Sequence, residues 1–174
     1  MTASLSFTAR FAGALLLSAG LAFLLQPAIG HAAGGGGDEN TEASSNSNNP
    51  TVDDMIDDAE DYIDDEEYQQ AIALLEQARV QEPDNADVLN YLGYSHRKLG
   101  EQTVALDFYT AALAQEPQHL GANEYLGELY LEMKDLPKAE ERLAVLATAC
   151  DSDCEEYEDL AEEIAEYKEA NGAS

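Results

Sequence analysis

A period of 34 residues in the middle of the chain constrains the fold more than any single residue does. Ala71, Ala105 and Ala139 stand at this interval, and three further registers repeat it: Tyr62, His96 and Tyr130; Leu75, Tyr109 and Leu143; and Pro83 and Pro117. A repeat of this length is a supersecondary unit that cannot bury its apolar face alone, so such units stack on one another. The period therefore predicts an open-ended stack of similar units.

The middle unit carries a recognisable motif. It reads Leu89-x-x-Leu92-Gly93-x-x-His96, then Ala105-x-x-x-Tyr109, then Pro117. This pattern resembles the tetratricopeptide repeat, a helix-turn-helix unit. The third unit keeps Leu126-Gly127 and Ala139, whereas the first matches mainly through its register. The resemblance implies an all-α solenoid of three units, residues 52–85, 86–119 and 120–153.

Small and cyclic residues support this interpretation on physical grounds. Gly93 and Gly127 fall in the middle of predicted helices, where Gly costs about 1 kcal/mol relative to Ala. A helix tolerates this cost where a neighbouring helix passes too closely for a side chain. Gly100 is placed to end a helix in a left-handed conformation, and Pro137 to begin one. The sequence thus predicts tight helix packing and marks several helix ends.

The N-terminus has the layout of a secretory signal peptide, residues 1–32. Arg10 precedes an apolar run over residues 11–25, and small residues around Ala32 suggest the cleavage position. Fifteen apolar residues are fewer than the roughly 20 that a spanning helix needs. We therefore expect an exported, periplasmic protein; the alternative is a membrane anchor formed by an uncleaved N-terminal segment. Residues 33–51 are rich in Gly, Ser, Asn and acids, which predicts a disordered linker.

A last helix is predicted over residues 154–170, followed by a short tail, residues 171–174. Tyr157, Leu160, Ile164 and Tyr167 share one stripe at helical spacing, and acidic residues occupy the opposite face. One apolar and one polar face suit a capping helix at the open end of a stack.

Cys150 and Cys154 flank the turn before this helix. In an exported protein an even number of cysteines indicates a disulfide, here a staple of the turn. The alternatives are a redox-active pair, free thiols or a metal site. The spacing is not C-x-x-C, and the acids around the pair oppose thiolate formation.

The resemblance also implies which residues face a partner, because the first helix of each unit lines the inner, concave surface in this family. In the second and third units these positions form a partner-binding groove: Asn90, Tyr94, Arg97, Lys98, Glu124, Tyr125 and Glu128. Tyr and Arg are frequent in binding hot spots. The alternative is that Tyr94 and Tyr125 only pack against neighbouring helices.

Charge narrows the class of partner. The chain has 36 acidic and 8 basic residues, a net charge of −28, so phosphate backbones are repelled and a basic protein or peptide is favoured. A solvated acidic surface or adaptation to salt is the alternative explanation. No spacing typical of catalysis, of a cofactor or of a metal site stands out. We therefore predict a non-catalytic, exported protein-interaction adaptor. The alternatives are a thiol-disulfide or metal-handling accessory protein that uses Cys150 and Cys154, and a purely structural acidic envelope protein.

The effect of the acidic charge on stability can be tested at the first predicted helix. Asp53, Asp57, Asp61 and Asp64 repeat at spacings that bring like charges together, and this repulsion is weakly screened at low ionic strength. We expect the thermal midpoint to rise with NaCl and the first unit to open first, measured by calorimetry and hydrogen exchange. A midpoint that stays constant from low to high salt would contradict this prediction.

Overall fold

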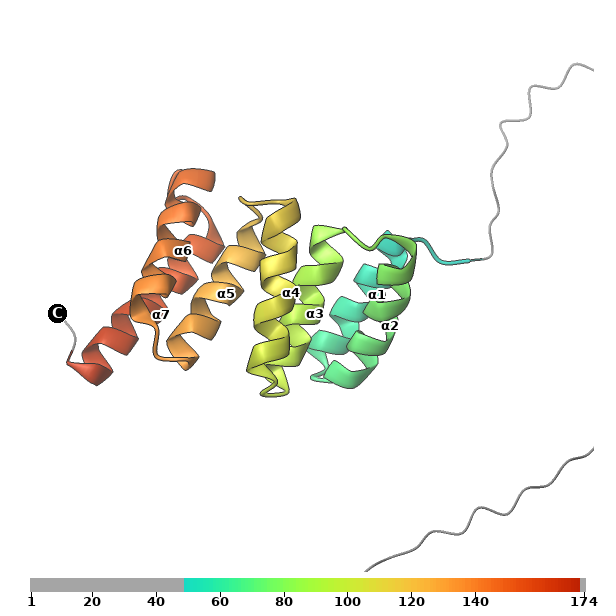
Figure 1. Ribbon diagram of the computed structural model, residues 1–174, viewed down its shortest axis with the longest axis horizontal. Helices are drawn as coiled ribbons and strands as arrows, with labels where there is room; N and C mark the ends of the chain where they lie inside the picture. Colours follow the sequence, from blue (N-terminus) through green and yellow to red (C-terminus); the bar gives the residue numbers. More distant parts are fainter. Residues whose placement is uncertain (1–48, 173–174) are drawn as a thin grey trace, which may run out of the picture. The chain divides into compact units, whose positions relative to one another are not determined.

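The computed structural model describes residues 49–172; the predicted signal peptide and most of the predicted linker lie outside this range. Seven helices and no strand are found within it (Figure 1). They are α1 (Val52–Asp64), α2 (Tyr68–Gln81), α3 (Ala86–Lys98), α4 (Gln102–Gln115), α5 (Leu120–Glu132), α6 (Leu136–Ala149) and α7 (Glu155–Asn171).

The helices form antiparallel pairs that stack in chain order. α1 packs on α2, α3 on α4, and α5 on α6, while α2 contacts α3 and α4 contacts α5. α7 covers the last pair and contacts both α5 and α6. Figure 1 shows the pairs side by side in one row. The prediction of an all-α, helix-turn-helix solenoid is confirmed.

The helix ends explain how the units begin and turn. Thr51 starts α1 with a capping box: its hydroxyl accepts from the backbone N–H of Asp54 at 3.1 Å, and the Asp54 carboxylate accepts from the backbone N–H of Thr51 at 2.9 Å. Gly100 adopts φ +79°, as expected for a left-handed residue after a helix. Pro137 lies in the first turn of α6, where a missing N–H has no cost.

Close helix contacts occur at the two glycines that the sequence singled out. A Cβ atom on Gly93 would lie 2.7 Å from ring atoms of Tyr109 in α4. A Cβ atom on Gly127 would lie 2.5 Å from a methyl carbon of Leu160 in α7. Tyr109 and Leu160 are both fully buried. The prediction of tight packing at these positions is therefore confirmed, and Gly127 fixes how α7 sits on the stack.

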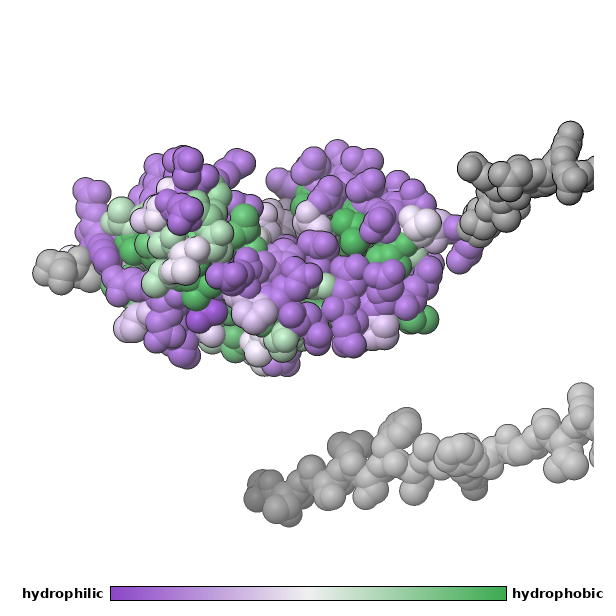
Figure 2. Space-filling model, turned by 90° about the horizontal axis from the view of Figure 1, so that it is seen from above, coloured by the Kyte–Doolittle hydropathy of each residue, from purple (hydrophilic) through white to green (hydrophobic). Residues whose placement is uncertain are grey.

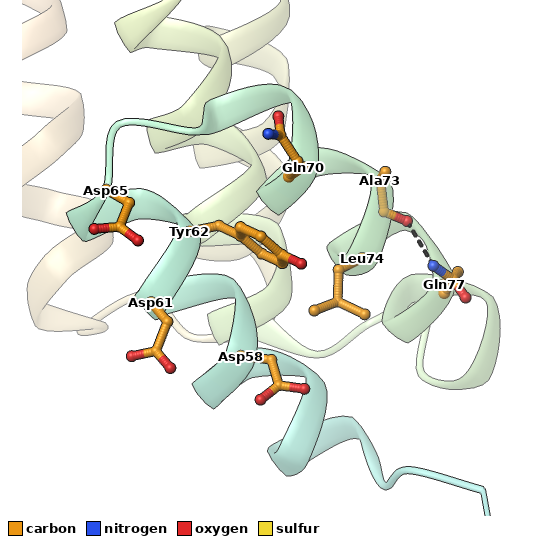
Figure 3. Close-up of a pocket in the computed structure, with 8 residues that line it drawn as sticks. All are labelled: Asp58, Asp61, Tyr62, Asp65, Gln70, Ala73, Leu74 and Gln77. Carbon is orange, nitrogen blue, oxygen red and sulfur yellow. Dashed lines mark hydrogen bonds between the residues drawn. The ribbon is translucent and has the colours of Figure 1, made fainter.

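The N-terminal pair carries a pocket of about 620 Å³ with an acidic rim. Tyr62 lies between α1 and α2 with its ring toward Leu74, and Asp58, Asp61 and Asp65 lie along α1 (Figure 3). Tyr62 is 38% exposed. Its register partner His96 instead stacks on Phe108, with ring centroids 5.4 Å apart. The same register position is therefore more open at the first unit.

The surface in view in Figure 2 is hydrophilic over most of its extent, with hydrophobic residues in smaller areas. Among the helices of residues 49–172, none is long and apolar enough to cross a membrane.

Replacing Gly93 with Ala tests the close approach of α3 and α4. Ala raises helix propensity by about 1 kcal/mol, but its Cβ collides with the rigid Tyr109 ring, and overpacking costs about 1–3 kcal/mol. We expect a lower midpoint in urea unfolding. In a double-mutant cycle, Tyr109→Leu should remove part of the penalty. An equal effect of Gly93→Ala in the native background and in the Tyr109→Leu background would show that the ring is not the obstacle.

Candidate functional site

The first helix of each unit, together with α7, forms one face of the stack, which we call the first-helix face. α1 contacts α3, α3 contacts α5, and α5 contacts α7. Two pockets open on this face, one of about 240 Å³ between α1, α3 and α5 and one of about 400 Å³ between α3, α5 and α7. Both are lined by Tyr91 and Tyr125, so the pockets adjoin.

An aromatic cluster occupies the centre of the first-helix face. The rings of Tyr94 and Tyr125 lie 4.8 Å apart between centroids, and Tyr68 and Tyr109 each approach one of them at 6.5 Å. Lys98 Nζ lies 5.0 Å from the Tyr94 ring centroid, within range of a cation–π interaction. Tyr94 and Tyr125 are only half-buried. They therefore pack against each other and still line the smaller pocket.

Arg97 belongs to the structural support of this cluster. Its guanidinium pairs with Glu128 and, at 2.9 Å, with Glu132, both on α5. It also lies 5.5 Å from the Tyr94 ring centroid and 5.8 Å from that of Tyr125. The side chain is only 6% exposed. Because both carboxylates already neutralise it, Arg97 ties α3 to α5 and does not present a free charge to a partner.

The larger pocket, which we call the acidic pocket, is lined almost entirely by polar groups. Asn90 and Glu124 form its floor and are 3% and 7% exposed. α7 supplies three of the remaining carboxylates and α3 one. The lining residues are Asp87, Asn90, Tyr91, His119, Leu120, Gly121, Glu124, Tyr125, Glu155, Glu156 and Asp159. No Lys or Arg is among them.

Burial makes Glu124 an unusual carboxylic acid. Desolvation, followed by the charges of Glu128, Asp159 and Glu156, raises the pKa of Glu124 from its ordinary 4.5 to about 8, while Arg97 acts in the opposite direction. At neutral pH the group is therefore largely protonated. Among the described residues, no Lys or Arg forms an ion pair with the carboxylate of Glu124, whereas Arg97 pairs with Glu128 and Glu132.

His119 is already engaged at the edge of the acidic pocket. Its Nε2 lies 2.9 Å from Asp87 Oδ1, and its Nδ1 accepts from the backbone N–H of Ala122 at 3.2 Å. His119 thereby caps α5 and uses both ring nitrogens. It is not available as an additional ligand.

The predicted groove residues divide between two places. Tyr94, Arg97, Lys98, Tyr125 and Glu128 come together around the aromatic cluster, whereas Asn90 and Glu124 lie in the acidic pocket, which Tyr125 also borders. Three of the seven are buried: Asn90, Arg97 and Glu124. Helical spacing places a residue on a face but does not tell how deeply neighbouring helices cover it.

The sequence analysis missed the contribution of the last helix. It placed the acidic residues of this helix on the polar face, and two of them, Glu156 and Asp159, line the acidic pocket, where Asp159 remains exposed. α7 begins 35 residues after α5, so it takes the place of the first helix of a further unit. Extending the 34-residue period by one unit would have aligned Glu158 with Glu124, one position before Asp159, and so indicated that this helix occupies the place of a first helix.

The two cysteines lie at the turn between α6 and α7. Cys150 ends α6, Cys154 precedes α7, and a disulfide joins them across Cα atoms 5.9 Å apart. Asp151 and Ser152 between them both have positive φ, near +54° and +59°, which is uncommon for residues other than Gly. The disulfide closes a turn that the backbone alone disfavours. Within residues 49–172, no three His, Cys, Asp or Glu side chains converge to hold a metal ion.

Two family models of the tetratricopeptide repeat match the chain, over residues 56–119 and 103–164. The matches include all three units, and the chain therefore belongs to the tetratricopeptide repeat family. No curated protein matches the sequence.

Solved structures share this fold at low identity. MamA is 22% identical, with a TM-score of 0.58 over 76% of this chain and 72% of its own. The chaperone SycD of Yersinia enterocolitica, solved with a peptide of the translocator YopD, is 17% identical, with a TM-score of 0.59 over 72% and 95%. The first repeat domain of Spaghetti (RPAP3), bound to the HSP90 peptide SRMEEVD, is 15% identical, with a TM-score of 0.61 over 70% and 94%. Similarity at this level establishes the fold alone.

Replacing Glu124 with Gln tests the electrostatics of the acidic pocket. The unfolded carboxyl ionises near pH 4.5 and the folded one near pH 8, so the folded state loses stability as pH rises between these values. We expect Glu124→Gln to raise the thermal midpoint at pH 9 by a few degrees, about what 1 kcal/mol gives in a domain of this size. The gain should disappear below about pH 4.5.

The matched control is Glu116→Gln, which removes one charge from an exposed position outside the acidic pocket. Equal gains for the two variants at pH 9 would show that general charge repulsion, and not burial of Glu124, governs the effect.

Proposed function

We propose that this protein is a non-catalytic, exported adaptor that binds a protein or peptide, preferably a basic one, on the first-helix face. The observation that carries this proposal is the pair of adjoining pockets, which place half-buried tyrosines beside carboxyl groups, most of which make no ion pair. Tyrosines provide contact area at low entropic cost, and the carboxylates set the sign of the partner's charge.

Structures of similar fold support a peptide-binding role for this protein. SycD binds a YopD peptide, and the Spaghetti (RPAP3) domain binds the acidic peptide SRMEEVD. Here the only exposed cation of the predicted groove is Lys98, because Arg97 is neutralised by Glu128 and Glu132. An acidic ligand would meet repulsion from the acidic pocket, so a basic partner fits this chain better.

Export rests on the N-terminal sequence. The arrangement of Arg10, the apolar run over residues 11–25 and the small residues near Ala32 supports secretion to the periplasm.

The experiment is capture of partners by the exported protein, cross-linked in its native compartment and identified by mass spectrometry. The test variant is Asp64→Lys/Glu155→Lys, because Asp64 lines the smaller pocket and Glu155 the acidic pocket. The matched control is Asp53→Lys/Glu158→Lys, which makes the same charge change on the same helices outside both pockets.

We expect a partner that is captured by the native protein and the control and lost from the test variant. Loss from both variants would show that net charge alone drives capture. Retention by both would place the binding surface elsewhere, and either result would contradict the proposal.

A further inference from the structure

Apart from His119, which bonds to Asp87, the acidic pocket is lined by no cationic side chain, and carboxyl groups dominate its polar lining. Its carboxylates come from three helices: Asp87 from α3, Glu124 from α5, and Glu155, Glu156 and Asp159 from α7. The guanidinium of Arg97, which acts on Glu124, is committed to Glu128 and Glu132. Like charges brought together in this way repel one another unless a cation joins them.

Asn90 provides independent evidence for a missing donor. Its residue is 3% exposed, it lines the acidic pocket, and its Oδ1 is buried without a hydrogen-bond partner. Its amide packs against Gly121, where even a Cβ atom would approach Nδ2 to 3.2 Å. An unpaired buried carbonyl costs about 1–3 kcal/mol. A donor that enters the acidic pocket would remove this cost.

The walls suit a side chain with an apolar stem and a charged tip. Tyr91 and Tyr125 are half-buried tyrosines of the pocket lining. Glu124 on α5 is buried, whereas Glu155 and Asp159 on α7 are exposed. Lys and Arg pack their methylene stems on apolar surface and place the charge in polar surroundings. The volume of about 400 Å³ is in the range of ligand pockets, about 300–1,000 Å³.

We propose that the acidic pocket binds one cationic side chain, Lys or Arg, of the partner, with Asn90, Glu124 and Asp159 as the recognising groups. This inference rests on the proposed function, because it assigns a subsite within the same first-helix face. The proposed ligand is an organic cation on a peptide and not a metal ion, because the carboxylates of the described residues do not converge on a metal position.

The burial of Glu124 gives the subsite a pH dependence. The groups that face it are Asp87, Tyr91 and Arg97 of α3, His119, Tyr125 and Glu128 of the α5 segment, and Glu155, Glu156 and Asp159 of α7. A bound ammonium favours the ionised carboxylate, so binding releases a proton. With a pKa of about 8, the ionised fraction rises from about a tenth at pH 7 to about nine-tenths at pH 9. Affinity for a lysine should rise roughly tenfold over this interval.

The test uses NMR titration of the ¹⁵N-labelled folded protein with Nα-acetyl-lysine methylamide at low salt. The neutral control ligand is the same compound acetylated on Nε, and Nα-acetyl-arginine methylamide distinguishes guanidinium from ammonium. We expect saturable shifts at the Asn90 side-chain amide and the Gly121 backbone amide with the cationic probes. The neutral probe should bind at least tenfold more weakly.

Two variants make the assignment specific. Glu124→Gln should remain folded, abolish most of the binding and eliminate the rise with pH, while Asp159→Asn should weaken binding at constant fold. Calcium chloride serves as a competing probe. Unchanged binding in Glu124→Gln, equal shifts with the neutral probe, or displacement of the lysine probe by micromolar calcium would overturn the subsite.

Failure of the subsite and failure of the adaptor function are distinguishable. Partner capture that survives Glu124→Gln, together with absent probe binding, would reject the cationic subsite and leave the adaptor function standing. Loss of capture in Glu124→Gln, with probe binding confined to the native protein, would support both.

Discussion

The close approach of helices at one glycine in α3 and one in α5 is the constraint on which the rest of the structure depends. Gly93 admits the ring of Tyr109, and Gly127 admits the side chain of Leu160. The second contact is made with α7 and not with the partner helix α6. It therefore aligns α7 with the first helices and brings its carboxylates to the edge of α5. The close contact at Gly127, which the sequence predicts, therefore also completes the acidic pocket.

Most of the fold could be predicted because its determinants are local and repeated. The period, the two glycines and the positions of Gly100 and Pro137 each specify a helix contact or a helix end, and each is found where the sequence places it. The N-terminal boundary follows from Thr51 in the same way. The depth of side chains could not be predicted. Arg97 reads as a free basic residue until α5 supplies Glu128 and Glu132 from 31 and 35 positions further along.

For the candidate site, the sequence predicted which residues of α3 and α5 share a face, but not how the packed helices group them or that α7 contributes. Tyr94 and Tyr125 share a face by helical spacing, yet only the packing of α3 on α5 brings their rings within 4.8 Å. The acidic pocket also needs α7, and α7 reads from its sequence mainly as a cap because Leu160 and Ile164 form a clean apolar stripe. A helix that only caps the stack differs from a helix that also lines a pocket in which of its polar side chains face a neighbouring helix. The amino-acid composition of the helix does not determine this.

The disulfide connects this arrangement to stability. α7 is held at its N-terminal end by Cys154, one residue before Glu155, so the bond that closes the turn also fixes where the carboxylates of α7 begin. Those carboxylates help to raise the pKa of Glu124 and so oppose folding at alkaline pH. A chain selected for stability alone would gain from a neutral residue at position 124. A repulsive pocket assembled by a covalent constraint and a close helix contact is instead the arrangement expected where the compensating charge comes from a partner.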